Sequence, residues 1–380
     1  MDKFLLMHKD TIVAGITIEK DDNDEGYLHV HKVGNVSLLP YGVKNTTFEN
    51  IDNEITLWND TRCIPMGRPN YKPFLDGIGL KNNAELLAHS YMCSLTDCYW
   101  FKPFGSDVHW KDVNFYDNRF SSNLYKHIFY GDDSEQVNTL NAPDITTDGA
   151  LPKMWIEREN GNFALVKSSL GSCPMDVYNE IIADAILTEL NVPHVHYWIE
   201  EHNGSDCSVC ECFIHSNNEE FVPLRNILRD YECTEPDFLP ALRSAGLSID
   251  LDKMMLADII MGNTDRHAGN YGIILDSDTQ SIKGFAPLFD HGVCNMIHDL
   301  SRARYRPTGE TFGATLQKLD PHVLELASKI NFDNIKNVIW SLPIDDNRKE
   351  QIARRLSDRI DAVNELIRGA EHDFDRSDRF

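Results

Sequence analysis

The segment from Asp258 to Gly292 constrains this chain more than any other, because its polar residues follow one another at short, defined spacings. Asn270 follows Asp265 by five residues, and Asp290 comes one hairpin's length of chain later. A phosphoryl-transfer site needs a carboxylate that accepts the proton of the attacking hydroxyl, and an Asn and a second Asp whose oxygens hold magnesium. The spacing therefore predicts Asp265 as the base and Asn270 and Asp290 as magnesium ligands.

A predicted hairpin separates these two parts of the segment. Residues 271–275 and 282–289 are predicted as strands, with a turn at residues 276–278 between them. We expect the hairpin to return Asp290 to the side of Asn270. The alternative is a purely structural loop, since Asp, Asn and Gly are frequent in turns for reasons of backbone geometry alone.

A lysine and a glutamate upstream complete the candidate set. Lys167 ends an almost continuous apolar strand at residues 163–167, where a lysine is unusual unless its ammonium has an anionic partner. Glu180 lies beside the apolar stripe of a predicted helix over residues 175–190. In a kinase the lysine binds the α- and β-phosphates of ATP and the glutamate orients it. The alternative is that Glu180 is solvated and Lys167 extends its ammonium into water.

The composition of the chain limits the classes of protein to which it can belong. The 380 residues predict two or three domains, and 42% hydrophobic with 25% charged residues is typical of soluble globular proteins. Nine cysteines without a repeated framework favour reduced thiols, and the N-terminal apolar segment is too short for a signal peptide, so we expect a cytoplasmic protein. The net charge of −24 argues against direct nucleic-acid binding, and no apolar, basic or amphipathic segment predicts membrane binding.

The expected domains are an aromatic-rich N-terminal accessory module at 1–140, a β-rich N-lobe at 141–222, a helical C-lobe at 223–370 and a charged tail at 371–380. Within the module we expect a strand at 11–18 and a helix at 82–95. Its aromatic residues, from Tyr99 to Phe120, fit either a surface for a protein partner or a small core, and their density favours the core. The C-lobe helices are expected at 238–245, 250–262, 321–329, 333–340 and 347–368.

Two other clusters have more than one explanation. Cys207, Cys210 and Cys212 have the spacing of a metal knuckle, but a zinc site needs a second cluster, so buried strand cysteines are favoured. Arg302, Arg304 and Arg306, expected in a segment without periodicity, fit either an anion-binding surface or a solvated run of charge.

Five motifs occur in order between residues 144 and 370: D-G-A-L-P-K at 148–153, L-V-K at 165–167, Y-N-E at 178–180, N-T-D-R-H-A-G-N at 263–270 and A-P-L-F-D at 286–290. With these motifs the sequence resembles the HipA-like serine/threonine kinase family, in particular its shorter bacterial members. It is more distantly similar to phosphoinositide kinases. The resemblance implies an α+β, two-lobed protein-kinase-like fold that uses ATP and Mg²⁺.

The resemblance also implies roles for individual residues. The implied catalytic residues are Asp265, Lys167 and His267; the ATP-binding residues are Thr147, Asp148, Gly149, Ala150, Lys153 and Lys167, with Glu180 orienting Lys167; and the metal ligands are Asn270 and Asp290. Some family members are silenced when a serine of the phosphate-binding turn is autophosphorylated, and the matching positions here are Thr146 and Thr147. Residues 1–140 depart from the usual N-terminal domain of the family's toxins, so the resemblance assigns neither a toxin–antitoxin role nor a protein substrate.

The sequence as a whole predicts an ATP- and Mg-dependent kinase for Ser/Thr hydroxyls of a protein, with an N-terminal module that offers a surface for a protein partner. Three alternatives stay open. A lipid kinase of the phosphoinositide type would need a membrane-binding segment. An AMP transferase would differ only in the mass of its product. A non-catalytic nucleotide-binding scaffold would have no need of Asp265.

Overall fold

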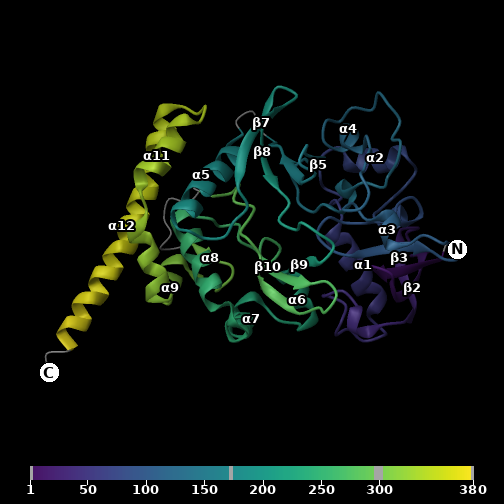
Figure 1. Cartoon of the computed structure of the whole chain (residues 1–380), viewed down its shortest axis with the longest axis horizontal. Helices are drawn as coiled ribbons and strands as arrows, with labels where there is room; N and C mark the ends of the chain where they lie inside the picture. Colours follow the sequence, from purple (N-terminus) through teal and green to yellow (C-terminus); the bar gives the residue numbers. More distant parts are fainter. Residues whose placement is uncertain (1–2, 171–173, 295–302, 378–380) are drawn as a thin grey trace. The chain divides into compact units, whose positions relative to one another are not determined.

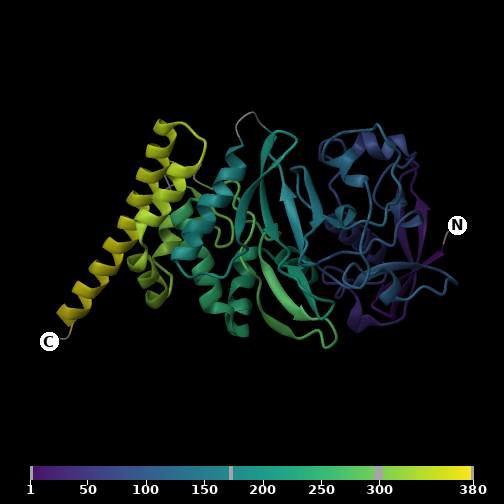
Figure 2. The same cartoon turned by 45° about the horizontal axis from the view of Figure 1, so that its top comes forward.

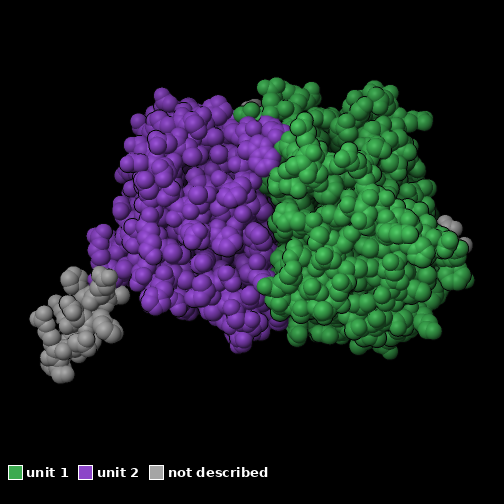
Figure 3. Space-filling view, in the orientation of Figure 1, with its two compact units in different colours: residues 1–170, 201–232, 273–283 green, residues 171–200, 233–272, 284–380 purple. Residues whose placement is uncertain are grey.

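The computed structural model describes residues 3–170, 174–294 and 303–377, and side chains as far as residue 368. The chain divides into two compact units, coloured separately in Figure 3. Unit 1 comprises Met1–Leu170, Glu201–Glu232 and Ile273–Lys283; unit 2 comprises Gly171–Glu200, Cys233–Gly272 and Gly284–Phe380. Among the described residues, no helix has both the length and the apolar character needed to span a bilayer.

An antiparallel sheet forms the N-terminal part of unit 1 (purple and blue in Figure 1). Its order is β3-β2-β1-β4, with strands β1 (Lys3–His8), β2 (Thr11–Lys20), β3 (Gly26–Val33) and β4 (Tyr99–Pro103). The predicted strand at 11–18 is thus confirmed. The helices of this part are α1 (Ile51–Arg62), α2 (Tyr71–Gly77), α3 (Trp110–Val113) and α4 (Leu124–Ile128), with 3-10 turns at Val36–Leu38, Glu85–Ala88 and Pro143–Thr146.

The predicted helix at 82–95 is wrong, because the structure has only the 3-10 turn Glu85–Ala88 there. Two interactions with distant residues hold the backbone away from a helix. The Asn82 side chain donates to the carbonyl of Gly26, and the Arg62 guanidinium donates to the carbonyl of Met92, which has a positive φ of 53°. Tertiary contacts have overridden a local apolar period here.

A second sheet of order β5-β6-β8-β7 contains β5 (Lys153–Glu157), β6 (Phe163–Lys167), β8 (Ser205–Glu211) and β7 (Tyr197–His202). Its strands are the teal arrows near the centre of Figure 2. β5 and β6 form an antiparallel hairpin, in which Lys153 pairs with Lys167. A third sheet, β11-β10-β9, contains β9 (Glu219–Pro223), β10 (Gly272–Asp276) and β11 (Ile282–Phe285), and α6 (Leu224–Asp230) follows β9. The hairpin predicted after Asn270 is therefore present.

The aromatic residues of the N-terminal stretch form a core rather than an open surface. Trp100, Trp110 and Phe115 are buried in one cluster with Phe163 of β6 and with Cys212. Cys207 and Cys210 are also buried, and no disulfide or candidate metal cluster in the described part of the chain includes these three cysteines. The buried-cysteine interpretation is confirmed. The aromatic cluster also shows that residues on both sides of position 140 share one core.

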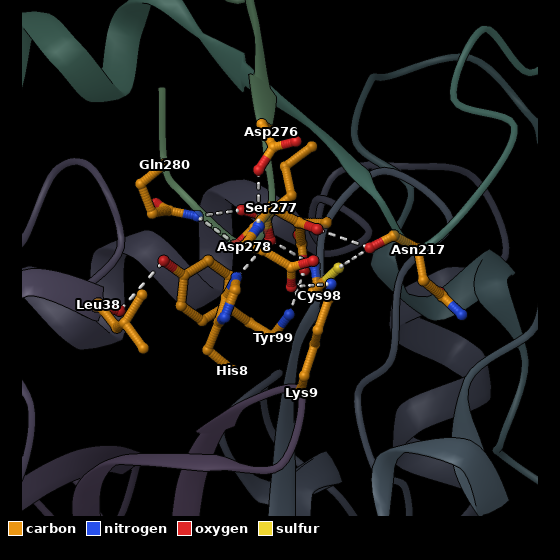
Figure 4. Close-up of polar contacts among 12 residues, drawn as sticks. His8, Lys9, Leu38, Cys98, Tyr99, Asn217, Asp276, Ser277, Asp278 and Gln280 are labelled. Atoms are coloured by element: carbon orange, nitrogen blue, oxygen red, sulfur yellow. Dashed lines mark hydrogen bonds and ion pairs between the residues drawn. The ribbon is translucent and has the colours of Figure 1, made fainter. Parts of the chain in front are cut away.

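A buried carboxylate, that of Glu220, ties the N-terminal sheet to the third sheet, and Figure 4 labels three residues that bind it, His8, Cys98 and Gln280. Glu220 of β9 accepts hydrogen bonds from His8 Nε2 at 2.9 Å, Cys98 N at 2.8 Å and Gln280 Nε2 at 2.8 Å. Burial alone raises the pKa of Glu220, but the hydrogen bonds from His8, Gln280 and the Cys98 amide outweigh it, so the pKa lies below its usual value. The charged carboxylate is thus the form that stabilises unit 1.

Helices dominate unit 2, the purple body of Figure 3. Its helices are α5 (Met175–Glu189), α7 (Glu235–Leu242), α8 (Ser248–Met261), α9 (Phe312–Leu316), α10 (Pro321–Leu324), α11 (Phe332–Ser341) and α12 (Asp346–Ser377), with a π-helical turn at Arg243–Leu247 and a 3-10 turn at Glu325–Lys329. α8 contacts α5, α9, α10 and α12, and its methionines are buried in the core.

The C-terminal part of unit 2 differs in detail from the sequence-based expectation. α12 continues to Ser377, beyond the predicted end at residue 368 and through part of the predicted tail. The short strands β12 (Arg304–Tyr305) and β13 (Glu310–Thr311) pair within the segment expected to be irregular. Arg304 and Arg306 are both exposed, and Arg302 lies outside the described residues. The predicted boundaries at 140, 222 and 370 stay a prediction.

Replacing Glu220 tests the buried carboxylate. Glu220→Ala leaves three buried donors without their acceptor, so we expect the free energy of unfolding to fall by about 3–5 kcal/mol at pH 7, measured by urea unfolding with tryptophan fluorescence. The wild-type advantage is present above the unfolded pKa of about 4.3 and is lost as the pH falls through the lower folded pKa. Glu219→Gln is the control, because that neighbour is partly exposed and pairs with the exposed Lys283, and its effect should stay below about 1 kcal/mol. Equal effects of the two substitutions would contradict this role for Glu220.

Candidate active site

The site in unit 2 begins where α8 ends. Gly262 adopts a left-handed conformation with φ 66° and its amide donates to the carbonyls of Asp258 and Ile259, which closes the helix. A Cβ at Gly262 would collide with the Arg359 guanidinium, which donates to the carbonyl of Ile260. The chain therefore turns sharply at Gly262 into the loop of residues 263–270.

A buried ion pair holds this loop against the end of α8. Arg266 binds Asp258 through Nε and Nη2, each at 3.0 Å, and both side chains are fully buried. Asp258 also accepts from Asn263 Nδ2 at 3.0 Å and from Tyr305 OH at 2.6 Å. Burial lowers the pKa of Arg266, but the Asp258 carboxylate more than offsets it, so the net pKa is raised and the guanidinium is charged.

The same guanidinium joins the two polar loops. Arg266 Nη1 donates to the carbonyl of Asn270 at 2.8 Å and to that of Phe289 at 3.0 Å. Arg266 Nη2 also lies 3.1 Å from His291 Nδ1. The Arg266 guanidinium thus contacts the backbone of Asn270 and also Phe289 and His291, the residues on either side of Asp290. The structure therefore brings together the two ends of the predicted hairpin.

Glu180 of α5 contacts the second loop. It is fully buried, and its Oε2 accepts a hydrogen bond from His291 N at 2.8 Å. The neighbouring Asn179 donates from Nδ2 to the carbonyl of Gly292 at 2.8 Å. α5 therefore positions the segment that follows Asp290. The predicted pairing of Glu180 with Lys167 stays a prediction, because the two residues belong to different units.

The predicted catalytic residues have the following local geometry. Asp265 is partly buried, and its amide donates to Asn263 Oδ1 at 3.1 Å. Asn270 donates from Nδ2 to the carbonyl of Asp265 at 3.4 Å, so Oδ1 remains its acceptor atom. His267 accepts from the Gly269 amide through Nδ1 at 3.0 Å, which orients its ring. Asp290 has a positive φ of 61°, a conformation that Asp and Asn tolerate better than other side chains.

This donor set fits magnesium. Asn270 Oδ1 and the Asp290 carboxylate are hard oxygen ligands, and an ion held by one or two carboxylates keeps several waters. Arg266 binds the carbonyls of Asn270 and Phe289, so the backbone that carries both ligands is held by one group.

The predicted phosphate turn lies in unit 1 and is well anchored. Thr146 donates from Oγ1 to the Cys93 carbonyl at 2.8 Å, and Thr147 donates to the Pro143 carbonyl at 2.7 Å and accepts from Trp155 Nε1 at 2.8 Å. Both threonines are buried, whereas Ala150 is exposed. Either hydroxyl therefore becomes accessible to a modifying group only when the turn opens.

Gly149 has a conformation that the turn requires. Its φ is 103°, and a Cβ there would collide with Lys153 Nζ, which donates to the Asp148 carbonyl at 3.0 Å. Its amide is 2.6 Å from Asp148 Oδ1. Glycine thus permits the close approach of a lysine ammonium to the turn backbone.

Sequence reasoning missed two arginines that hold this turn. Arg68 is buried and donates to the carbonyls of Thr147 and Gly149, the latter at 2.8 Å, while Arg225 donates to Asp148 Oδ2 at 2.6 Å. Burial lowers the pKa of Arg68 to about 10, which leaves it cationic at neutral pH. Neither arginine has a fixed sequence spacing to the D-G-A-L-P-K motif, so no local signal predicted them.

Lys153 and Lys167 lie opposite each other on β5 and β6 and are both buried. Directly opposed side chains of an antiparallel pair point to the same face, and like charges in this arrangement destabilise the sheet. Lys167 is buried, so the alternative in which its ammonium extends into water is wrong. The phosphate-binding role of the two lysines stays a prediction.

The comparisons with known proteins are structural. No family model and no curated protein matches the sequence. A chain of the Shewanella oneidensis MR-1 toxin–antitoxin complex of HipA, HipB and operator DNA is similar with a TM-score of 0.59 and 13% identity, over 96% of this chain and 99% of that chain. The Helicobacter pylori proinflammatory kinase CtkA gives a TM-score of 0.45 and 16% identity, over 58% of this chain and 95% of that chain.

The likeness to HipA shows the fold. The α+β, protein-kinase-like fold predicted from the sequence is confirmed, and the resemblance to HipA holds at the level of structure. Because 96% of the chain is covered, the likeness includes most of residues 1–140, where the sequence departs from the family. That departure is therefore one of sequence rather than of fold.

Arg266→Lys tests the joint between the two loops. Lysine keeps the charge but lacks the planar fork that contacts Asp258, Asn270 and Phe289 together, so we expect a loss of at least about 2 kcal/mol in stability. Hydrogen exchange should accelerate in peptides covering residues 263–271 and 286–292. Arg354→Lys is the control, because that side chain is exposed and pairs only loosely with Asp358. Wild-type exchange in both peptides would contradict the role assigned to Arg266.

Proposed function

We propose that this chain is an ATP- and Mg-dependent phosphotransferase that acts on Ser or Thr hydroxyls of a protein. The observation that carries the proposal is the attachment of two loops to one buried group: Arg266 Nη1 donates to the carbonyl of Asn270 and to that of Phe289, the residue before Asp290. A base and two oxygen ligands fixed in this way are what phosphoryl transfer needs, because its catalysis is mostly positioning and charge neutralisation.

The residues divide the work as follows. Asp265 accepts the proton that the attacking hydroxyl loses. Asn270 and Asp290 hold Mg²⁺, and Glu180 and Arg266 keep the peptide of Asp290 in place. Lys153, Lys167 and the amides of the turn at 147–150 bind the phosphates. The bound Mg-nucleotide supplies the phosphoryl group and neutralises its charge.

Intact mass before and after incubation with Mg-ATP tests the reaction. We expect the wild type to gain about 80 Da per phosphoryl group, whereas a gain of about 329 Da would reassign the reaction to AMP transfer. Asp265→Asn and Asp290→Asn should each slow the gain by at least about a hundredfold, since each removes one essential charge. Asn also tolerates the positive φ at position 290.

Asp358→Asn is the matched control, because that carboxylate is exposed on α12 and should leave the rate unchanged. Nucleotide binding is measured on the same samples. ATP bound without any gain in mass, for the protein alone and with a panel of protein substrates, would contradict the proposal and favour a nucleotide-binding scaffold.

Autophosphorylation of Thr146 or Thr147 is proposed as a regulatory step. Both hydroxyls are bonded inside the turn, so a phosphate on either cannot be accommodated without displacing residues 143–150. We expect peptide mapping to find phosphate within 140–155 and hydrogen exchange of this turn to increase afterwards. Phosphate incorporated into the same peptide of a Thr146→Ala/Thr147→Ala variant would exclude these two sites.

A further inference from the structure

A cluster of two histidines and one aspartate lies in unit 2, apart from the residues used above. His194 and His196 follow α5 in the sequence His-Val-His, and Asp184 lies on α5 itself. Asp184 Oδ1 is 3.2 Å from His194 Nε2, 3.1 Å from His196 Nδ1 and 3.1 Å from the Tyr197 amide. One carboxylate oxygen therefore faces two imidazole nitrogens.

The contact with His194 is chemically unusual. His194 Nδ1 is 2.7 Å from the carbonyl of Val192, and a carbonyl oxygen can only accept, so Nδ1 carries the proton. In the neutral ring Nε2 is then an acceptor, and it faces a carboxylate oxygen that is also an acceptor. A shared cation, or a second proton on the ring, converts this contact into an attraction. His196 Nδ1 faces the same carboxylate oxygen at 3.1 Å, so a cation shared by Asp184 and His194 would have a third ligand beside it.

The spacing of the three atoms fits a metal ion. Zinc with bonds of about 2.0–2.1 Å and tetrahedral angles separates neighbouring ligand atoms by about 3.3 Å. The observed separations from Asp184 Oδ1 are 3.2 and 3.1 Å, and all three atoms lie within 4.8 Å of one another. The Val192 carbonyl is the outer partner that fixes the tautomer of a metal-binding histidine.

The burial of the cluster is graded. The exposed fraction of the side chain is 4% for His194, 22% for Asp184 and 74% for His196. One ligand is rigidly packed, and the opposite side is open to solvent, so an ion can enter and retain water in its remaining positions. Two imidazoles and one carboxylate suit zinc and its neighbours among the transition metals rather than magnesium, which prefers oxygen ligands.

We propose that Asp184, His194 and His196 form a binding site for a divalent transition-metal ion such as Zn²⁺, separate from the magnesium ligands Asn270 and Asp290. The site connects directly to the loop of Asp290. Tyr197, whose amide binds Asp184, contacts the Asp290 amide through its hydroxyl at 3.2 Å. A cation at this site restrains the strand that supports the Asp290 peptide.

The described part of the chain holds two other clusters of potential metal ligands. Neither has a contact between two acceptor atoms like that of His194 Nε2 with Asp184 Oδ1. In the cluster of His8, Cys98 and Glu220, the carboxylate already accepts three hydrogen bonds, and burial raises the pKa of the Cys98 thiol far above neutrality. In the cluster of Glu19, His29 and His31, the imidazoles contact Asp52 and the hydroxyl of Thr17. A histidine and a hydroxyl can always arrange one donor and one acceptor.

Zinc titration of the chelator-treated full-length protein, in competition with a chromophoric chelator, tests the site. We expect the wild type to bind one equivalent of Zn²⁺ that His196→Ala and Asp184→Asn bind at least about tenfold more weakly. His196 is mostly exposed, so its replacement should leave the fold intact. His31→Ala is the matched control, because it removes a histidine from the chain's other His-x-His sequence and should retain the equivalent.

The proposed zinc site would be contradicted if His196→Ala bound Zn²⁺ as tightly as the wild type does. It would also be contradicted if His31→Ala lost as much zinc affinity as His196→Ala. Hydrogen exchange measures the connection to Asp290: Zn²⁺ should slow exchange of peptides covering residues 284–292 in the wild type and not in His196→Ala. If Zn²⁺ binds but does not slow hydrogen exchange of residues 284–292, the claim that the ion restrains the Asp290 peptide is wrong. Neither readout depends on phosphoryl transfer, so these outcomes are independent of the proposed kinase activity.

Discussion

The ion pair of Arg266 and Asp258 is the interaction on which the site in unit 2 depends. Taking both charges out of water costs several kcal/mol for each ion, and the pair is tolerated only when its remaining hydrogen-bonding groups are satisfied. Here Asn263 and Tyr305 donate further hydrogen bonds to the Asp258 carboxylate, and the carbonyls of Asn270 and Phe289 accept hydrogen bonds from the Arg266 guanidinium. The hydrogen bonds that make the buried pair acceptable are therefore the same ones that fix the two functional loops.

The hairpin that joins these two loops could be predicted from the sequence. Asp265, Asn270 and Asp290 lie within 26 consecutive residues, and the only element between the loops is a hairpin with clear turn chemistry. α8 could likewise be predicted from its apolar period and from Gly262, which ends it. Local signals suffice where the chain that joins the functional residues is short and regular. Their roles in catalysis stay predictions until the reaction is measured.

The turn in unit 1 could not be predicted to the same depth. Its motif was visible, yet the groups that hold it are Arg68, about 80 residues upstream, and Arg225, about 75 residues downstream, and no periodicity relates such distant positions. The wrong helix at 82–95 has the same origin, since hydrogen bonds from Arg62 and Asn82 to distant carbonyls decided that backbone. The contact of Glu180 with the His291 amide also had no sequence signal.

The distribution of charge makes the proposed function compatible with an acidic chain. A net charge of −24 would repel ATP if it were spread evenly, but unit 1 places Arg68, Lys153, Lys167 and Arg225 at or beside one short turn. Unit 2 presents carboxylates and an amide oxygen instead. Phosphates suit the first set and magnesium suits the second. The proposed function thus assigns to each set the ligand that its charge favours, and it needs no excess of positive charge over the chain as a whole.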